Sequence, residues 1–269
     1  MFEPYLTQWQ LTPDGGLLST HSSRLLPVRC ADGRAAMLKV ATATEERFGG
    51  LLMNWWDGQG AAQVYAHDGD ALLLERAQGQ QDLLDMALAG RDDEATRIIC
   101  AAVTRLHAPR AAPMPKLIPL SNWFGSLEAA AGQYGGVYTQ CLATTRELLA
   151  TQREIVALHG DVHHRNVLDF EERGWLAIDP KRLLGERAFD YVHVLCNPDL
   201  PTTPDAERFY RQLDIVVQAS GLPRRRLLQW TIAFSGLSAA WFLEDGQEPH
   251  SDLGVVRHAL AALKGEARP

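Results

Sequence analysis

The sequence predicts an α+β fold of two lobes, with a small β-rich lobe first and a larger, mainly helical lobe after it. Two observations lead to this prediction. Short apolar runs separated by turn residues fill most of the first 75 residues, as in an antiparallel sheet. Beyond residue 78, apolar residues recur mostly at helical spacing. We therefore divide the chain into residues 1–77 and 78–269, with a connector near residues 75–80.

Length and composition indicate a globular protein in a reducing compartment. The chain has 269 residues, 46% of them hydrophobic, which is enough for a proper core. Its formal net charge of −7 disfavours nucleic acid as a partner, because a polyanion would be repelled. The sequence shows no secretory signal, no apolar run long enough for a membrane span and no C-x-x-C pair among its four cysteines. We expect a cytoplasmic protein without a membrane partner.

The first lobe is predicted to contain a small antiparallel sheet. A turn of sequence Ala-Asp-Gly-Arg at residues 31–34 separates two apolar runs, Leu25–Cys30 and Ala35–Val40. Asp-Gly favours a tight hairpin, because glycine adopts the positive φ that such turns require. Two more short strands, Val64–Ala66 and Ala71–Glu75, follow and complete the expected sheet.

Helices account for most of the remaining structure. Two acidic residues after Thr44 indicate a helix start, because carboxylates there oppose the positive end of the helix dipole. Elsewhere glycine and proline mark the expected helix ends, and Pro109–Pro119 is expected to be a loop. The predicted helical ranges are residues 44–56, a segment through Leu106 ending at Pro109, Asn122–Gln152 with an interruption at Gly135-Gly136, and Pro204–Lys264 with breaks at Pro223 and Pro249.

One polar segment interrupts the second lobe. It lies between the predicted strands Ile155–Leu158 and Trp175–Ile178 and places an aspartate, three histidines, an arginine and an asparagine within eight positions. Buried polar groups cost about 1–3 kcal/mol each when unpartnered, so structure alone rarely demands such a cluster. Asp161 and Asn166, with Asp179 after the second strand, supply three oxygen-bearing side chains. This set is suited to binding Mg²⁺ and aligning a hydroxyl group.

The spacing of these residues matches a catalytic loop for phosphoryl transfer. Asp161 precedes Asn166 by five positions, as in the protein-kinase loop H-R-D-x-x-x-x-N. His159 occupies the histidine position of that loop, and Gly160 stands where it has arginine. Asp179 takes the place of the D-F-G aspartate, which holds Mg²⁺ in kinases.

Residues of the first lobe extend the match. Lys39 lies on a predicted apolar strand, like the lysine of the kinase V-A-I-K strand, and Glu46 follows on the next predicted helix, where it could pair with Lys39. No G-x-G-x-x-G loop precedes this strand. Residues 19–24 read Ser-Thr-His-Ser-Ser-Arg instead, and Ser22 and Ser23 are candidates to hold phosphate through backbone or hydroxyl groups.

The sequence resembles the aminoglycoside phosphotransferase superfamily, and more narrowly its aminoglycoside/hydroxyurea resistance kinases, which include streptomycin 6-phosphotransferases. The residues that carry the resemblance are Leu158–Leu168, Gly174–Lys181, Leu184–Glu186 and Phe189-Asp190, with weaker matches between about residues 20 and 241. The resemblance implies a bilobal protein-kinase-like fold. It also implies transfer of the ATP γ-phosphate to a hydroxyl group of a small molecule, such as the aminoglycoside streptomycin.

The resemblance implies a role for each candidate residue. Asp161 would orient the attacking hydroxyl group and accept its proton, and Asn166 and Asp179 would hold Mg²⁺. Lys39, fixed by Glu46, would contact the α- and β-phosphates of ATP. The remaining implied roles are hydrogen bonds to adenine from the backbone of Glu75 to Ala77, phosphate contacts from Ser22 and Ser23, and support of the catalytic loop backbone by Asp190.

The substrate and the reaction class each leave an alternative open. For the expected streptomycin-like aminoglycoside, Glu244 and Asp245 are candidate contacts for a guanidinium or ammonium group. The acceptor could also be a sugar, an amino alcohol or another hydroxylated metabolite. A kinase-like protein without catalysis is a further possibility, although Lys39, Asp161 and Asp179 are all present.

The three histidines of the polar segment allow an alternative hypothesis, in which the protein is a metal-dependent enzyme of another class. The cluster His159, Asp161, His163 and His164 is the kind of donor set that a metal-dependent hydrolase uses. This reading leaves Asn166, Asp179 and Lys39 without roles. Beside Asp179, the side chains Lys181 and Glu186 are either substrate contacts or an ordinary loop ion pair.

Overall fold

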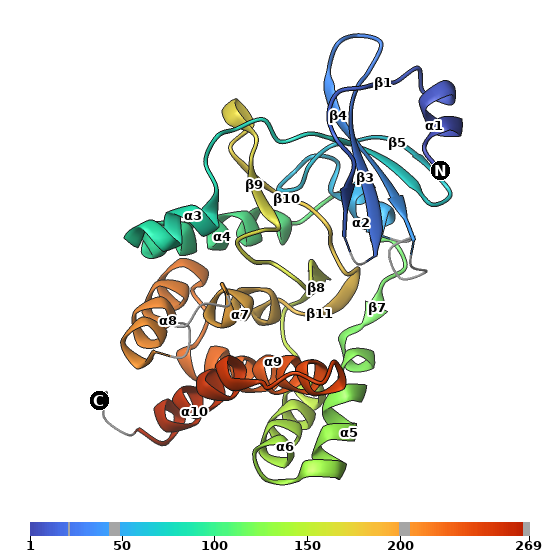
Figure 1. Cartoon of the computed structure of the whole chain (residues 1–269). Coiled ribbons are helices and arrows are strands. Elements are labelled where there is room, and N and C mark those ends of the chain that lie inside the picture. Colours follow the sequence, from blue (N-terminus) through green and yellow to red (C-terminus); the bar gives the residue numbers. More distant parts are fainter. Residues whose placement is uncertain (21, 43–48, 199–204, 266–269) are drawn as a thin grey trace.

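The computed structural model describes residues 1–20, 22–42, 49–198 and 205–265, and it has two lobes, as the sequence predicts (Figure 1). Within the described residues, the first lobe is built on an antiparallel sheet of six strands in the order β1-β3-β4-β6-β5, with β2 paired to β3. Its elements are α1 (Glu3–Gln8), β1 (Thr12–Pro13), β2 (Leu18–Ser19), β3 (Ser23–Arg29), β4 (Ala35–Ala41), α2 (Gly49–Trp56), β5 (Val64–Asp68) and β6 (Ala71–Glu75).

Strands β3 and β4 form the hairpin that the Asp-Gly turn predicts. Gly33 in the turn has a φ of 87°, a value that glycine adopts without steric cost. Alternate side chains of β4 are buried in the core of the first lobe: Ala36, Leu38 and Val40. Because successive side chains of a strand point to opposite faces, Met37 and Lys39 lie on the other face, where they line a cavity between the lobes.

Two boundaries in the first lobe differ from the prediction. The strand predicted to end at Ala66 continues to Asp68, because its pairing with β6 extends that far. The helix predicted over residues 44–56 is described from α2 onward. The candidate residue Glu46 lies outside the described residues.

The second lobe consists mainly of helices (Figure 1). Its elements are α3 (Leu83–Met86), α4 (Asp92–Leu106), β7 (Ile118–Pro119), α5 (Gly125–Tyr134), α6 (Gly136–Ala150), β8 (Ile155–Leu158), β9 (Val167–Asp169), β10 (Trp175–Ala177), β11 (Leu183–Glu186), α7 (Ala188–Cys196), α8 (Ala206–Ser220), α9 (Arg224–Glu244) and α10 (His250–Lys264). The interruption at Gly135-Gly136 and the breaks at Pro223 and Pro249 fall at helix boundaries, as predicted. Among the described helices, none is long and apolar enough to cross a membrane.

Two predictions in this lobe are wrong in detail. The segment Pro109–Pro119, predicted to be a loop, ends in the strand β7, where Ile118 pairs in parallel with β11. This pairing partner is distant in the sequence, so local patterning gives no sign of the strand. The strand predicted over Trp175–Ile178 ends one residue earlier, at Ala177, although the N–H of Ile178 still donates to the carbonyl oxygen of Asn166 at 2.9 Å.

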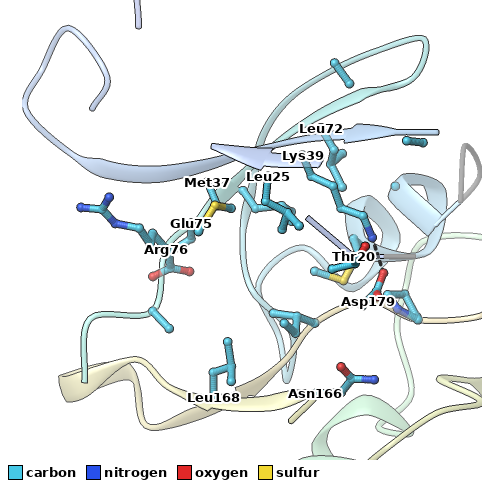
Figure 2. A pocket seen from close by; sticks show the side chains of 18 of the residues that line it. Thr20, Leu25, Met37, Lys39, Leu72, Glu75, Arg76, Asn166, Leu168 and Asp179 are labelled. Atoms are coloured by element: carbon cyan, nitrogen blue, oxygen red, sulfur yellow. Dashed lines mark hydrogen bonds and ion pairs between the residues drawn. The ribbon is translucent and has the colours of Figure 1, made fainter. Parts of the chain in front are cut away.

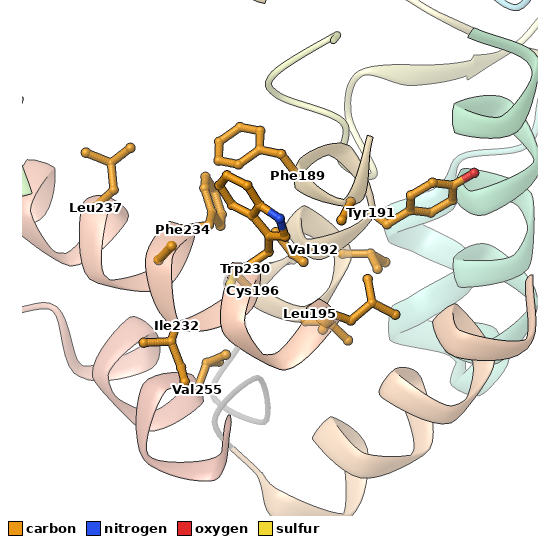
Figure 3. Packing of buried hydrophobic residues seen from close by; sticks show 14 of the residues in the cluster. Phe189, Tyr191, Val192, Leu195, Cys196, Trp230, Ile232, Phe234, Leu237 and Val255 are labelled. Atoms are coloured by element: carbon orange, nitrogen blue, oxygen red, sulfur yellow. The ribbon is translucent and has the colours of Figure 1, made fainter. Parts of the chain in front are cut away.

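The largest apolar core surrounds α7 and α9 (Figure 3). Phe189 of α7 makes edge contacts with Trp230 and Phe234 of α9, with ring centroids 5.7 Å apart in both pairs. Such aromatic pairs contribute about 0.5–1.5 kcal/mol beyond the burial of apolar area. Because Asp190 is the next residue, this packing fixes the position of its carboxylate beneath the polar segment.

A second apolar core joins the two lobes. Trp56 of α2 is buried in it with Leu176 and Ala177 of β10, and the N–H of Ala62 donates to the carbonyl oxygen of Ala177 at 2.9 Å. These contacts hold β10 against the first lobe. The chain that follows β10, with Asp179, therefore enters the space between the lobes.

Two helix glycines provide a matched test of this packing. A Cβ at Gly236 in α9 would lie 2.5 Å from the Cβ of Cys141 in α6, whereas a Cβ at Gly132 in α5 would meet nothing within 4 Å. Gly236→Ala is expected to lower the free energy of unfolding by about 1–3 kcal/mol through overpacking. Gly132→Ala is expected to raise it by about 0.5–1 kcal/mol, because alanine is the better helix former. Urea unfolding measures both, and stabilisation by Gly236→Ala would contradict the close packing of α6 and α9.

Candidate active site

A cavity of about 440 Å³ lies between the lobes (Figure 2). Leu25 and Met37 of the sheet line one wall, and Leu168 of β9 lines the wall across from them. Lys39 and Asp179 also line the cavity and lie together to one side of it. Mainly apolar walls with a few polar groups are typical of small-molecule sites. The cavity therefore offers apolar walls to one part of a small molecule and a charged group, Lys39, to another part.

Lys39 and Asp179 form an ion pair (Figure 2). Their side chains are 13% and 33% exposed, and they come from β4 and from the loop after β10. Asp179 has a φ of 63°, a left-handed conformation that costs a non-glycine residue about 1–2 kcal/mol. The sequence predicts Glu46 as the partner of Lys39, but Glu46 lies outside the described residues. The structure shows Asp179 as a partner of Lys39.

Asp190 holds the polar loop between β8 and β9. Its carboxylate accepts the backbone N–H groups of His159 and Gly160, both at 2.8 Å, and lies 2.8 Å from Nε2 of His107. Burial alone would raise the pKa of this carboxyl, but the hydrogen bond and charge of His107 hold the pKa below its ordinary value. Asp190 is therefore an ionised anchor in the first turn of α7, at the place where the sequence expected support for the loop.

Asp161 and Asn166 lie side by side in this loop. The amide nitrogen of Asn166 donates to the backbone oxygen of Asp161 at 2.9 Å and lies 3.3 Å from its carboxylate. Two basic side chains flank the same carboxylate, with His163 Nε2 at 3.6 Å and Lys181 Nζ at 3.7 Å. Burial lowers the pKa of His163, which favours its neutral form. The carboxylate of Asp161 is thus oriented by an amide, an imidazole and an ammonium group.

Asn166 and Asp179 fit a divalent cation. Both line the cavity, and the hydrogen bond from Ile178 to the Asn166 carbonyl ties their two loops together. Because the amide nitrogen of Asn166 is directed at Asp161, its amide oxygen is left to act as a ligand. A carboxylate and an amide oxygen are donors that Mg²⁺ accepts well.

The serine candidates are not brought to the cavity. Neither Ser22 nor Ser23 is among the residues that line it, whereas Thr20 from the same segment is. Ser23 is the first residue of β3 and is fully buried, and its hydroxyl group has no hydrogen-bond partner among the described residues. Thr20 is the described residue of this segment that lines the cavity, and its hydroxyl group is hydrogen-bonded to the backbone of Ser23.

Of two further candidate groups, the connector residues line the cavity and Glu186 does not. Glu75, Arg76 and Ala77 line the cavity, and the Glu75 carboxylate is engaged in an ion pair with Arg173. The backbone is therefore what the connector offers to a ligand. Glu186 as a substrate contact is wrong, because its side chain is buried and its two carboxylate oxygens accept from Arg226 at 2.8 and 2.6 Å.

The three histidines of the polar loop do not form a metal site. His159 Nε2 lies 2.7 Å from the carbonyl oxygen of Ile178, and His163 lies beside Asp161. His164 is buried, with neither ring nitrogen hydrogen-bonded within the described chain. Among the residues that the structure describes, no three His, Cys, Asp or Glu side chains come together to bind a metal. The hydrolase alternative is therefore wrong, since His159 is engaged with the Ile178 carbonyl oxygen and no three of the proposed ligands, all of them described residues, come together.

A fourth histidine near the site makes stability depend on pH. His193 of α7 is buried against Phe189 and Phe234, and burial lowers its pKa from 6.5 to about 4. Between these two values the unfolded chain binds a proton that the folded protein does not, so stability falls as the pH falls below 6.5. The loss at pH 5 is about 2 kcal/mol. In urea unfolding at pH 7 and pH 5, His193→Leu is expected to lose less stability than the parent protein, and an equal loss would contradict the assignment.

Comparison with known proteins agrees with this geometry. The sequence model of the aminoglycoside/hydroxyurea antibiotic resistance kinases matches residues 8–246. The streptomycin 3''-kinase of Klebsiella pneumoniae is 52% identical over 246 residues, which cover 90% of this chain and 92% of that protein. The streptomycin 6-kinase of Streptomyces griseus is 32% identical, with 89% of this chain and 81% of that protein covered.

The fold is shared with solved phosphotransferases. A thermostable mutant of aminoglycoside phosphotransferase APH(4)-Ia, in a ternary complex with AMP-PNP and hygromycin B, matches with a TM-score of 0.66 at 14% identity over 99% of both chains. The structural similarity confirms the predicted bilobal kinase-like fold, and the matches to the family and to the streptomycin kinases confirm the predicted ATP-dependent phosphotransferase activity. This chain belongs to the aminoglycoside/hydroxyurea antibiotic resistance kinase family.

Proposed function

We propose that the chain phosphorylates streptomycin, with ATP as the phosphate donor and the 3''-hydroxyl group as the acceptor. The observation that carries this proposal is the 52% identity to the streptomycin 3''-kinase. The 6-kinase relative is 32% identical, so the 3''-hydroxyl group is favoured over the 6-hydroxyl group. The motifs in the sequence indicate a kinase but do not choose between these positions.

In the proposed reaction, residues 1–77 form the nucleotide-binding lobe, and residues 78–269 form the catalytic lobe, which also binds the acceptor. The adenine would lie between Met37 and Leu168, with the connector backbone at its edge. Lys39 would contact the phosphates, and Thr20 is better placed than Ser22 or Ser23 to face them, because it lines the same cavity. Mg²⁺ held by Asn166 and Asp179 would neutralise charge on the phosphates.

Asp161 would act on the acceptor. Its carboxylate is held by Asn166 and flanked by Lys181, which sets the direction from which a hydroxyl group can approach. The carboxylate would orient that hydroxyl group for attack on the γ-phosphorus and take its proton as the new bond forms. Asp190 would contribute indirectly by keeping the loop backbone in place.

Charge supports a cationic acceptor. The chain carries a formal net charge of −7, and Glu244 and Asp245 are exposed at the end of α9. Ser126 Oγ donates to a Glu244 carboxylate oxygen at 3.0 Å, which orients this side chain. We propose these two carboxylates as contacts for the cationic groups of the antibiotic.

The cysteines support a reducing compartment. All four are free, and burial raises the pKa of Cys100 and Cys141 to about 12. Two widely separated, buried thiols of this kind are not a disulfide framework. We propose that the protein acts in the cytoplasm, where ATP is plentiful, without a nucleic-acid or membrane partner.

An acceptor panel tests the proposed function. The purified protein is incubated with Mg²⁺, ATP and streptomycin, hydroxyurea or an amino alcohol, and ADP release is followed. Streptomycin is expected to give rapid ADP release and a monophosphate whose position is located by tandem mass spectrometry. Phosphate on the 6-hydroxyl group would overturn the assigned position, and absence of streptomycin phosphate would overturn the substrate.

A further inference from the structure

We propose that Lys181 is a catalytic residue, a cation that contacts the phosphoryl group during its transfer to the acceptor hydroxyl. The inference rests on the proposed phosphotransferase function and adds a group that the kinase motifs do not contain. Lys181 lies two positions after Asp179. Its ammonium nitrogen lies 3.7 Å from Oδ2 of Asp161, and its side chain is 30% exposed.

A backbone hydrogen bond fixes the position of Lys181 beside the loop that carries Asp161. Its N–H donates to the carbonyl oxygen of His159 at 2.6 Å, which joins the loop after β10 to the loop after β8. The residues on either side of this contact region, Asp179 and Arg182, have φ values of 63° and 55°. Left-handed conformations at two non-glycine residues cost about 1–2 kcal/mol each and persist where the surroundings demand them. The loop therefore follows an unfavourable path that delivers Lys181 to the catalytic loop.

Gly160 makes room for this approach. A Cβ at Gly160 would lie 3.1 Å from the Cβ of Lys181 and 2.8 Å from Cδ1 of Leu183. Gly160 also has a φ of 83°, which a residue with a side chain rarely adopts. Gly160 stands where the kinase loop has arginine, and it has no side chain. The Cβ of Lys181 therefore lies close to the backbone of Gly160. The loop after β8 thus has glycine in place of the kinase arginine, and the loop after β10 supplies a cation, Lys181, beside it.

The distribution of lysines also favours a role in the reaction. The sequence has four lysines, and two of them, Lys39 and Lys181, are each paired with a carboxylate of the candidate site. A partly exposed pair such as Lys181 and Asp161 adds only about 0–1 kcal/mol to stability. A fixed cation beside the charge that develops in phosphoryl transfer is worth about 10²–10³-fold in rate. The catalytic effect is therefore the larger of the two.

The chemistry balances with Lys181 unchanged at the end. The acceptor oxygen forms a bond to the γ-phosphorus as the bond from that phosphorus to the β,γ-bridging oxygen breaks. The proton of the hydroxyl group passes to Asp161, and the electron pair of the broken bond stays on ADP. Lys181 keeps its proton and donates hydrogen bonds to the oxygens of the group in transit.

Three variants test the proposal by kinetics. Lys181→Met, which keeps length and apolar stem, is expected to lower kcat for streptomycin by about 10²–10³-fold with KM for ATP changed by less than about threefold. Lys181→Arg is expected to recover part of the loss, because it restores a cation. Lys264→Met is the matched control, since Lys264 is exposed in the last turn of α10 and its loss should leave kcat unchanged. Equal loss of activity in Lys181→Arg and Lys181→Met would point to a structural role and overturn the proposal.

A binding measurement tests the proposal without turnover. Calorimetry with MgADP alone is expected to give similar Kd values for the parent protein and Lys181→Met. With MgADP and aluminium fluoride, which together mimic the transferred phosphoryl group, Lys181→Met is expected to bind about 10²-fold more weakly. Equal binding in both states would overturn the role of Lys181 even if streptomycin is confirmed as substrate. Failure of the parent protein to phosphorylate streptomycin would instead overturn the proposed substrate, and this binding difference would still be measurable.

Discussion

Asp161→Ala is expected to lower streptomycin-dependent ADP release by about 10²–10⁴-fold, the range for loss of a positioned general base. The reason is geometric. The carboxylate is held by the Asn166 amide at 3.3 Å and flanked by Lys181 at 3.7 Å, so no other described carboxylate of the site takes the same position toward an incoming hydroxyl group. Steady-state kinetics with saturating ATP measures the loss.

Folding and nucleotide binding of this variant serve as internal controls. Asp161 is one-third exposed and lies apart from the apolar cores, so Asp161→Ala should keep its Tm within a few degrees of the parent protein. Its affinity for MgADP should also be retained. Glu172→Gln, at an exposed carboxylate in the turn after β9, should keep full activity. Near-normal turnover by Asp161→Ala would show that the assigned role is wrong.

Asp190→Ala is expected to lower the free energy of unfolding by about 3–5 kcal/mol, a large part of the 5–15 kcal/mol typical of a folded domain. The variant leaves the buried N–H groups of His159 and Gly160 without their acceptors, and each such loss costs about 1–3 kcal/mol. It also removes the partner of His107. Urea unfolding followed by circular dichroism measures the change.

A milder substitution separates stability from activity. Asp190→Asn keeps one acceptor oxygen, so it should cost less stability and remain folded at 25 °C. Its activity should still fall, because one of the two N–H groups that fix the catalytic loop loses its partner and a small displacement of a reacting group reduces the rate strongly. Full activity together with full stability in Asp190→Asn would contradict the anchoring role.

Local sequence patterns were sufficient for much of the fold. They also selected Asp161, Asn166 and Asp179 as candidates, by their match to the spacing of the kinase catalytic loop, and the structure places Asn166 and Asp179 on the cavity wall. Met37 could also have been predicted to line the cavity. It lies two positions before Lys39 on β4, so the two side chains must share one face of the strand.

The errors share one physical cause. Ser22 and Ser23 were chosen as phosphate contacts, but Ser23, the first residue of β3, is buried, and Thr20 is the described residue of this segment that lines the cavity. Glu186 was considered for the substrate, but Arg226 of α9 claims its carboxylate. Burial in the folded protein decides both outcomes, and residue spacing along the chain does not reveal it.

Residue types and spacings along the chain predicted two lobes, the β-rich lobe before the helical one, and the candidate residues that we propose to bind Mg²⁺ and orient a hydroxyl group. Three-dimensional packing established their partners: Lys39 pairs with Asp179 across 140 residues, Asp190 holds His159 across 31 and Lys181 reaches Asp161 from a second loop. Backbone periodicity is a local property that neighbouring residues reveal. Contacts between distant segments arise only when the apolar cores close, because burial of those cores determines which loops meet.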